Sequence, residues 1–349
     1  MTGGEFMEPS FSLQCIFYDR PRLLQDVRAR IHSPAELMDY VRNLSPNDPF
    51  KPTALKRLER VPMIRQCMSD QGIEWLGLCH AHYPDALAML TDPPLGLFYL
   101  GKTTHLTDIF LGMVGTRRPS LIANDRLKSL LSGIGGYATV SGGALGIDAM
   151  VHAESLAMGI PTVAVLASGL DAMTPRTNQG LFQNIIQSGR GCIVSECPPG
   201  VVPKPYYFPQ RNRLIAALST KLMVIEASKR SGAVLTATLA AGLGRDVAAV
   251  VSGYGAPQSI GCYDLINDGA YAIGNDDGLC EFLGTIHSGR AVVSEDKDIL
   301  MQVPMEPIHI EELSHKLTVP LDKMIEYVTR LSLNGDVIIS SGQMVHRRA

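Results

Sequence analysis

Short apolar runs rich in β-branched residues recur from about residue 110 onward, and each is followed by a stretch with helical character. In chain order the runs read IFLGMVG, ATVSGG, PTVAVLASG, CIVSE, KLMVIEA and DVAAVVSG. Strands that are apolar along their whole length and alternate with helices are typical of a parallel sheet covered on both faces. The pattern therefore predicts an α/β fold built on a doubly wound, mostly parallel sheet.

The segments on either side of this alternation have different patterns. Upstream, AELMDYVRNL and ALKRLERVPMIRQCM have helical periodicity and precede the proline-rich DPPLGLFYLGK. Downstream, SEDKD and VPMEP indicate a linker, after which HIEELSHKL, LDKMIEYVTRLSLNG, DVIIS and MVHRR follow as helix, helix and hairpin. This order is typical of a winged helix. We expect a small helical N-terminal domain at 1–85, the α/β domain at 86–292, a linker at 293–303 and a winged helix at 304–349.

The composition narrows the class of protein. Hydrophobic residues make up 46% of the chain and charged residues 19%, as in a soluble globular protein, and the net charge of −3 excludes a broadly basic surface. Any nucleic-acid binding must therefore come from a local patch. The seven cysteines form no CxxC pair, and the N-terminal segment has neither the basic start nor the apolar core of a secretory signal. We expect a cytoplasmic protein with no metal site, no cofactor and no membrane contact.

The first candidate site is the motif GTRRPS, which follows a predicted strand and opens a helix. In open α/β sheets, ligands bind outside the carboxyl ends of the strands. Gly115 and Thr116 would present backbone N–H groups at a helix N-terminus, and Arg117 would add a charge-assisted contact to a phosphate. A tight turn with solvated arginines is the alternative. The motif is neither a Walker A loop nor GxGxxG, which disfavours an ordinary nucleotide triphosphatase or dinucleotide enzyme.

Two further strand-to-helix turns contain small residues that let a ligand approach the backbone closely. SGGALGID begins with Ser141, Gly142 and Gly143, and its aspartate is expected to cap the helix rather than to act as a catalytic acid. SGAVLTATL begins with Ser231 and Gly232. A glutamate at the end of the preceding strand, Glu226, is expected to order a neighbouring loop.

A basic and aromatic segment, KPYYFPQRNRLIA, lies between the apolar runs CIVSE and KLMVIEA. Six lysines and arginines oppose one acid between residues 201 and 230, a local balance of +5: Lys204, Arg211, Arg213, Lys221, Lys229 and Arg230 against Glu226. Arginines bind phosphates and aromatic rings stack on bases, as in surfaces that bind single-stranded nucleic acid. We expect Tyr206 or Tyr207 to stack on a base and Phe208 to be buried. The alternative is that the whole run anchors a loop in the core.

These motifs in this order resemble the bacterial DNA-processing protein A family, also called the Smf family. The resemblance runs from GTRRPS through SGGALGID, GLDAMTPRTN, SECPPGVVPKPYYFPQRNRLIAALS and EASKRSGAVLTATLAAGLGRDVAAV to DLINDGA, over about residues 110–273. It implies an extended Rossmann-like domain and a SAM-like N-terminal domain. It also implies a non-enzymatic, dimeric protein that binds single-stranded DNA and helps to load RecA where single-strand-binding protein covers the strand, in natural transformation.

The resemblance also assigns roles to residues. Arg117 and Arg176 would contact phosphates, and Arg211, Asn212 and Arg213 match the family's FPxRNR, so Arg211 or Arg213 is expected to reach the same groove. The candidate DNA-binding residues are Gly115, Thr116, Arg117, Ser141, Gly142, Gly143, Arg176, Lys204, Tyr206, Tyr207, Arg211, Asn212, Arg213, Ser231 and Gly232.

A Rossmann-type nucleotide phosphoribohydrolase is the alternative function. That group has a catalytic glutamate in a PGGxGTxxE motif. Aligning Thr236 with the threonine of the motif puts Leu239 at the position of the glutamate, so the carboxylate that this chemistry needs is missing. We therefore expect no catalytic residues.

Overall fold

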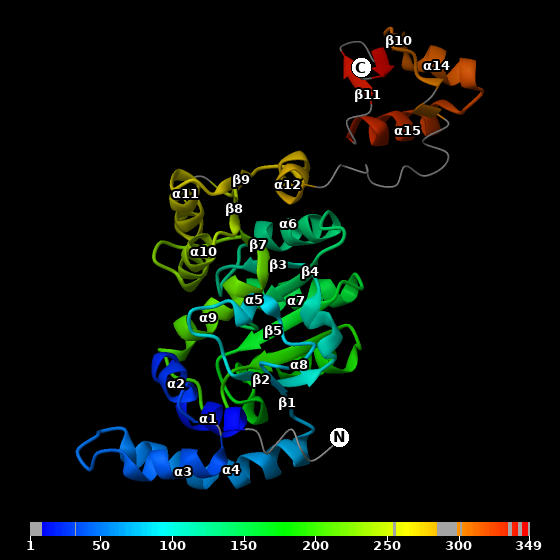
Figure 1. Ribbon diagram of the computed structural model, residues 1–349. Coiled ribbons are helices and arrows are strands. Elements are labelled where there is room, and N and C mark those ends of the chain that lie inside the picture. The colour runs from blue at the N-terminus through cyan, green and yellow to red at the C-terminus, as the bar shows by residue number, and fades with distance from the viewer. Residues whose placement is uncertain are drawn as a thin grey trace. The chain divides into compact units, whose positions relative to one another are not determined.

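A large twisted sheet organises the first part of the protein (Figure 1). The computed structural model describes residues 9–31, 33–253, 256–284, 299–300, 302–333, 337–340 and 344–347. Within these residues the large sheet has nine strands in the order β1-β2-β6-β5-β4-β3-β7-β8-β9. The strands are β1 (Glu74–Gly77), β2 (Gly96–Gly101), β3 (Phe110–Val114), β4 (Ala138–Ser141), β5 (Thr162–Leu166), β6 (Gly191–Ser195), β7 (Ser219–Val224), β8 (Asp246–Val250) and β9 (Tyr271–Ile273).

The strands from β3 to β9 run parallel, whereas β1 and β2 form an antiparallel pair at the edge beside β6. The six apolar runs of the sequence coincide with β3 to β8, which confirms the predicted α/β fold with a mostly parallel sheet. The first strand of the parallel part, β3, has β4 on one side and β7 on the other. The chain order reverses there, so the carboxyl ends of these strands meet at the place where open α/β sheets bind ligands.

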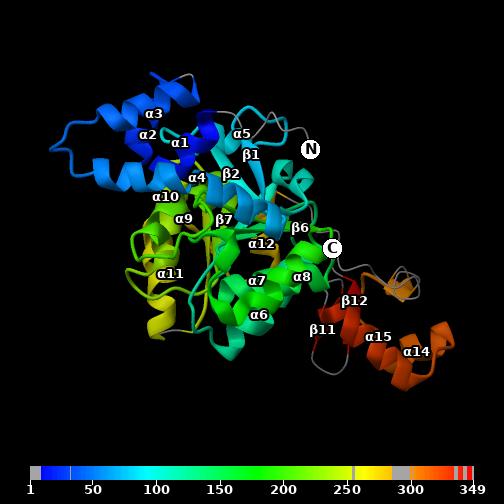
Figure 2. The ribbon, with the colours of Figure 1, turned by 90° about the horizontal axis from the view of Figure 1, so that it is seen from below.

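Helices cover both faces of the sheet. Figure 2 shows α9, α10 and α11 on one face and α6, α7 and α8 on the other. The helices of the sheet region are α5 (Asp85–Ala88), α6 (Leu121–Ser132), α7 (Ile147–Ala157), α8 (Gln179–Gln187), α9 (Tyr207–Leu218), α10 (Gly232–Gly242), α11 (Ile260–Asn267) and α12 (Asp276–Leu283). Serine caps fix two of the helix starts: Ser120 accepts a hydrogen bond from the N–H of Ala123, and Ser231 accepts one from Val234.

The strand side chains divide between two buried layers with the period of two that a strand imposes. In β3, Phe110 and Val114 pack on the side of α9 and α10, whereas Leu111 and Met113 pack on the side of α6 and α7. The strand is therefore apolar on both faces, as the continuous runs predicted.

Four helices precede the sheet: α1 (Pro9–Phe17), α2 (Pro21–Arg28), α3 (Pro34–Asn43) and α4 (Lys51–Gln71). Two of them, α3 and α4, match the predicted helical stretches. In α1, the buried side chain of Gln14 donates to the backbone oxygen of Glu196 (2.9 Å) and accepts from the N–H of Leu95 (3.0 Å). Also in α1, Phe11 packs edge-on against Trp75 of β1. The large sheet thus begins with β1, within the 1–85 range that we expected to be a separate helical domain.

The chain divides into two compact units, Met1–Thr285 and Ile286–Ala349. The described part of the second unit contains α14 (Ile310–Leu317), α15 (Leu321–Leu333) and a small sheet with the order β10-β12-β11, whose first strand precedes α14. Its strands are β10 (Ile308–His309), β11 (Val337–Ser340) and β12 (Met344–Arg347). Of the linker expected at 293–303, residues 293–298 and 301 lie outside the described residues, and Ile299 and Val303 belong to the core of this unit.

Candidate nucleic-acid interface

The turn after β3 holds Gly115, Thr116 and Arg117 in a fixed conformation. The N–H of Thr116 donates to the backbone oxygen of Glu226 (2.7 Å), and its own backbone oxygen accepts from the N–H of Ile147 (3.1 Å). A Cβ atom on Gly115 would lie 2.6 Å from the Ile147 side chain, so only glycine fits at this position. The side chain of Arg117 is exposed beyond this turn.

Glu226 orders the same turn, as the sequence indicated. Its carboxylate is buried and accepts hydrogen bonds from the N–H (3.0 Å) and the hydroxyl (2.5 Å) of Ser120. The loop after β3 is thereby tied to the loop after β7 at the point where the strand order reverses.

The glycine loop after β4 packs around the guanidinium of Arg211. A Cβ on Gly142 would lie 2.6 Å from Nη1 of Arg211, and Gly143 has a φ of 65°. The side chain of Asn178 donates to the backbone oxygen of Gly143 (3.0 Å), and Ser141 donates from its hydroxyl to Met113 (2.7 Å). Ser141, Gly142 and Gly143 are buried, so their contribution is to shape the edge of the sheet.

Arg211 is a buried structural residue in this fold. It is 6% exposed, and Nη1 donates to the backbone oxygens of Gly142 (2.5 Å) and Val165 at the ends of β4 and β5. Burial lowers the pKa of Arg211 to about 10, and the nearby Asp148 acts in the opposite direction. Burial raises the pKa of Asp148. Arg211 acts to lower it, as does the N–H of Ala144, which donates to the carboxylate at 3.4 Å. The expectation that Asp148 caps the helix is not met, because the N-cap of α7 is Gly146 without a side-chain cap; Asp148 lies in the first turn and binds the preceding loop through Ala144, near Arg211.

Arg213 and Asn212 also bind other parts of the protein. Arg213 donates to the carboxylate of buried Glu196 (2.5 Å) and lies 3.5 Å from that of Asp92. Asn212 is buried, accepts from Nε of Arg211 (3.0 Å) and donates to the backbone oxygen of Gly232 (3.4 Å). The expectation that Arg211 or Arg213 reaches a ligand groove is not supported by this geometry, because both guanidiniums already neutralise or bind internal oxygens.

The three aromatic residues before these arginines differ in exposure. Tyr206 is 52% exposed, Tyr207 is 3% exposed, and Phe208 is intermediate. The expectation that Phe208 is the buried anchor was wrong, because Tyr207 occupies that position. The hydroxyl of Tyr207 lies 3.2 Å from that of Tyr18 and accepts from that of Tyr206 (3.3 Å). Phe208 instead lies beside the exposed Arg117, whose guanidinium carbon is 5.6 Å from the ring centre.

Exposed cations line the carboxyl edge of the sheet on four loops. They are Arg117 and Arg118 after β3, Arg176 after β5, Lys204 after β6, and Lys229 and Arg230 after β7. From β6 to β7 there are four strand spacings, about 19 Å at about 4.8 Å each. Lys229 lies 3.5 Å from Asp264. The sequence-based set missed Arg118, Lys229 and Arg230, although their position directly after a strand was a signal that could have found them.

The carboxylates of the same loops point inward. Asp148, Glu196 and Glu226 are buried, and half-buried Asp171 accepts from the N–H of Gly200 (2.8 Å). Burial raises the pKa of Glu196 to about 7, while Arg213 acts to lower it. The exposed charges of these loops are therefore cations, whereas their carboxylates are buried or half-buried.

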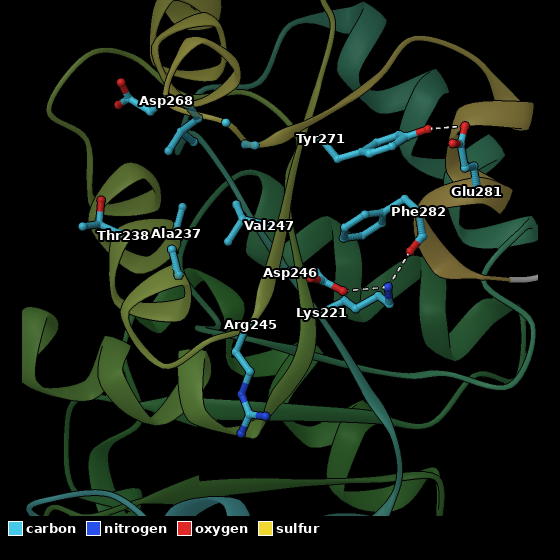
Figure 3. Close-up of a pocket in the computed structure, with 14 residues that line it drawn as sticks. Lys221, Ala237, Thr238, Arg245, Asp246, Val247, Asp268, Tyr271, Glu281 and Phe282 are labelled. Carbon is cyan, nitrogen blue, oxygen red and sulfur yellow. Dashed lines mark hydrogen bonds and ion pairs between the residues drawn. The ribbon is translucent and has the colours of Figure 1, made fainter.

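A cavity of about 680 Å³ lies at the opposite edge, at the amino ends of β7, β8 and β9 (Figure 3). Lys221 in its wall pairs with Asp246 (2.9 Å) and donates to the backbone oxygen of Phe282 (2.7 Å). Exposed Asp268 and Glu281 also line it. Arg245 also lines it and donates to the backbone oxygen of Ala217 (3.2 Å). Both cations of the cavity thus bind oxygens of the protein and two exposed carboxylates lie beside them, so a polyanion is favoured at the other edge.

The structure also bears on three other features considered from the sequence: the phosphoribohydrolase glutamate position, a metal site and a membrane-spanning helix. Leu239, at the position of the phosphoribohydrolase glutamate, packs against the core on the α10 side of the sheet. In the described parts of the chain, no group of three or more His, Cys, Asp or Glu side chains is placed to hold a metal ion. None of the described helices has both the length and the apolar character that crossing a membrane requires.

A doubly wound α/β sheet with exposed cations at its strand ends is typical of the Rossmann-type class of proteins. The chain belongs to the DNA recombination-mediator protein A family, which matches residues 74–284. The protein Smf of Synechocystis is 37% identical over 210 residues, which are 58% of this chain and 52% of that protein. The chain thus spans about half the length of this relative.

Two solved structures are similar to this chain. DNA processing protein A from Streptococcus pneumoniae has a TM-score of 0.63 at 26% identity, covering 79% of this chain and 94% of that one. DNA processing protein A from Helicobacter pylori has a TM-score of 0.54 at 29% identity, covering 60% of this chain and 94% of that one. The H. pylori structure is described as giving insight into a single-stranded DNA binding mode.

Proposed function

We propose that this chain binds single-stranded DNA along the carboxyl ends of β3 to β7. The observation that carries the proposal is the sorting of charge at this edge. In the described loops after these strands, six lysines and arginines are exposed, whereas the carboxylates are buried or bound to backbone N–H groups. A phosphate backbone is attracted by such a row and meets no fully exposed carboxylate on these loops.

Tyr206 supplies the contact to bases in this proposal. Its ring is exposed, and the ammonium group of Lys204 lies 5.8 Å from the ring centre. A ring held beside a cation offers a stacking surface next to a phosphate contact. Buried Tyr207 holds the Tyr206 ring in place. Its hydroxyl accepts a hydrogen bond from that of Tyr206, and the two ring centres lie 4.4 Å apart.

Membership of the recombination-mediator family supports the wider role that we propose. In it, the chain acts as a homodimer that loads RecA onto incoming single strands, including strands covered by single-strand-binding protein, during natural transformation in the cytoplasm. The binding edge has no catalytic task in this role. Release of free base from nucleoside monophosphates would instead indicate the phosphoribohydrolase activity.

Replacing Arg117 or Arg176 with alanine is expected to weaken binding of single-stranded DNA. Each exposed guanidinium that neutralises one phosphate should contribute about 0.7 to the slope of log affinity against log salt concentration. The measurement is fluorescence anisotropy with a labelled oligo-dT across a potassium chloride series. Arg190→Ala is the matched control, because Arg190 is equally an exposed arginine but lies before β6, at the amino edge. Affinities equal to that of the control in both variants would refute the proposed edge.

We further propose that residues 304–349 form a winged-helix domain, behind a linker within 293–303, with a protein-binding or regulatory role. From 304 to 349 there are five Lys/Arg against six Asp/Glu, a balance of −1, so the segment has little charge to offer to a phosphate backbone.

A chain truncated after Thr285, the end of the first unit, is therefore expected to keep most of its affinity for single-stranded DNA. The truncated and full chains should be compared on single- and double-stranded probes at the same salt concentration. Loss of most binding to both probes would place the DNA on the C-terminal unit.

A further inference from the structure

Two consecutive aliphatic side chains at the start of α6 are exposed to solvent. Leu121 is 88% exposed and Ile122 is 57% exposed, whereas the next residue, Ala123, is buried. Single exposed apolar residues are common on protein surfaces. These two, however, are neighbours in the first turn of a helix, at the edge where the exposed cations lie. Neither belongs to the core cluster that α6 helps to form.

The arginines of the same turn have apolar neighbours on two sides. Arg117 and Arg118 lie directly before this helix. On the other side, the backbone contact between Ile147 and Thr116 holds the β4–α7 loop against the turn, and a Cβ on Gly146 would lie 2.4 Å from the Thr116 oxygen. Leu145 is exposed on that loop. Exposed guanidiniums and exposed aliphatic side chains therefore lie on the same turn and on the loop packed against it.

The charges around this patch favour a polyanion over a second protein surface with basic groups. The segment GTRRPSLI contains two arginines and no acid. The nearest carboxylate at the turn, that of Glu226, is buried and hydrogen-bonded to Ser120. Asp125 is exposed one turn further along α6, beyond the two aliphatic residues.

Single-stranded DNA has the same alternation of chemistry. Its phosphates are charged and its unpaired bases have apolar faces; proteins that bind it combine cations along the backbone with aromatic rings on which the bases stack. Exposed aliphatic side chains can also cover an apolar base face, because both surfaces then leave water. We propose that Leu121 and Ile122 form an apolar platform for the nucleobases of the strand whose phosphates Arg117 and Arg118 bind. The inference rests on the proposed DNA-binding function and adds a base-contacting subsite to it. Aliphatic contact with a base face does not depend on hydrogen-bonding groups, so the platform accepts any base.

The test compares Leu121→Ser and Ile122→Ser with Ile109→Ser on two probes. Ile109 is the matched control, because its exposed fraction, 57%, equals that of Ile122, but it lies directly before β3, at the amino edge of the sheet. The probes are oligo-dT and an abasic deoxyribose-phosphate oligomer of equal length. We expect each platform variant to lose about fivefold in affinity for oligo-dT, the lower range of base-stacking contributions. Affinity for the abasic oligomer and the salt slope should not change.

Other outcomes separate the two proposals. Equal losses on both probes, or oligo-dT binding equal to that of Ile109→Ser, would overturn the platform while leaving the DNA-binding edge intact. Arg117→Ala should weaken binding of both probes, since it acts on phosphates. A wild-type chain that binds neither probe would overturn the proposed function as well. A change in molecular mass by light scattering in Leu121→Ser would show that the patch contacts a second copy of the chain, which also overturns the platform.

Discussion

Replacing Arg211 with alanine is expected to lower the free energy of unfolding by about 3–5 kcal/mol, because it leaves buried oxygens without their donors and removes a cation near a buried carboxylate. The substitution leaves the buried carboxylate of Asp148 without its cation. It also removes the donors for the backbone oxygens of Gly142 and Val165, which end two neighbouring strands. The measurement is urea unfolding followed by circular dichroism. Affinity for single-stranded DNA should fall as well, although Arg211 itself is buried, because the glycine loop packs around its guanidinium.

Three further variants keep this prediction testable if Arg211→Ala does not fold. Arg211→Lys retains the charge and should lose less stability. The double variant Arg211→Ala with Asp148→Asn removes both charges and should be more stable than Arg211→Ala alone. Arg118→Ala, at an exposed arginine, should change stability by no more than about 0.5 kcal/mol. A loss for Arg211→Ala as small as that for Arg118→Ala would contradict the assignment of Arg211 as a buried structural residue.

The stability of the protein is expected to decrease as pH rises from about 4.5 to about 7, through the ionisation of Glu196. Burial raises the pKa of this carboxyl from 4.5 to about 7, with Arg213 lowering it and Asp92 raising it. In this window the folded state still holds a proton that the unfolded state has released, so each rise in pH favours unfolding. The shift corresponds to a loss of at most about 3 kcal/mol, reached above pH 7.

Glu196→Gln cannot ionise, so its stability should change less over the same pH window. Urea unfolding of both proteins at several pH values between 4.5 and 8 measures the difference. The stabilisation by protonated Glu196 is present in full below its pKa in the unfolded state. It is lost as the pH rises through its pKa in the folded state. Parallel pH profiles for the wild type and the variant would show that Glu196 remains ionised throughout.

The strands β3 to β8 could be predicted from the sequence because each is a continuous apolar run that the fold buries on both faces. The antiparallel pair of β1 and β2 could not be predicted in the same way. Its first strand has only four residues, EWLG, between a long helix and a loop. The pairing of β2 with β6 joins residues about a hundred positions apart in the sequence, and no local pattern specifies such a contact.

The candidate site was predictable in its position and less so in its individual residues. The glycine- and serine-containing turns that follow the strands marked the correct edge, because that edge follows from chain direction alone. Whether an arginine is exposed depends on which oxygens lie opposite it, and these come from other loops, as the contacts of Arg211 with two strand ends illustrate. For the aromatic run, helical spacing was an available signal, since Tyr207, Arg211 and Leu214 share the buried face of α9.

The contacts of Gln14 with the sheet have a consequence for how this chain can be divided. Its amide group bridges the backbone next to two strands that lie far apart in sequence, at Leu95 and Glu196. Phe11, one turn earlier on the same helix, closes the core around Trp75 and Phe98. The first helix is therefore a structural part of the sheet region, although it precedes the first strand in the sequence. Recombination between related genes that exchanged the helical segment alone would separate an amide from both of its partners, so the segment and the sheet are expected to be inherited together.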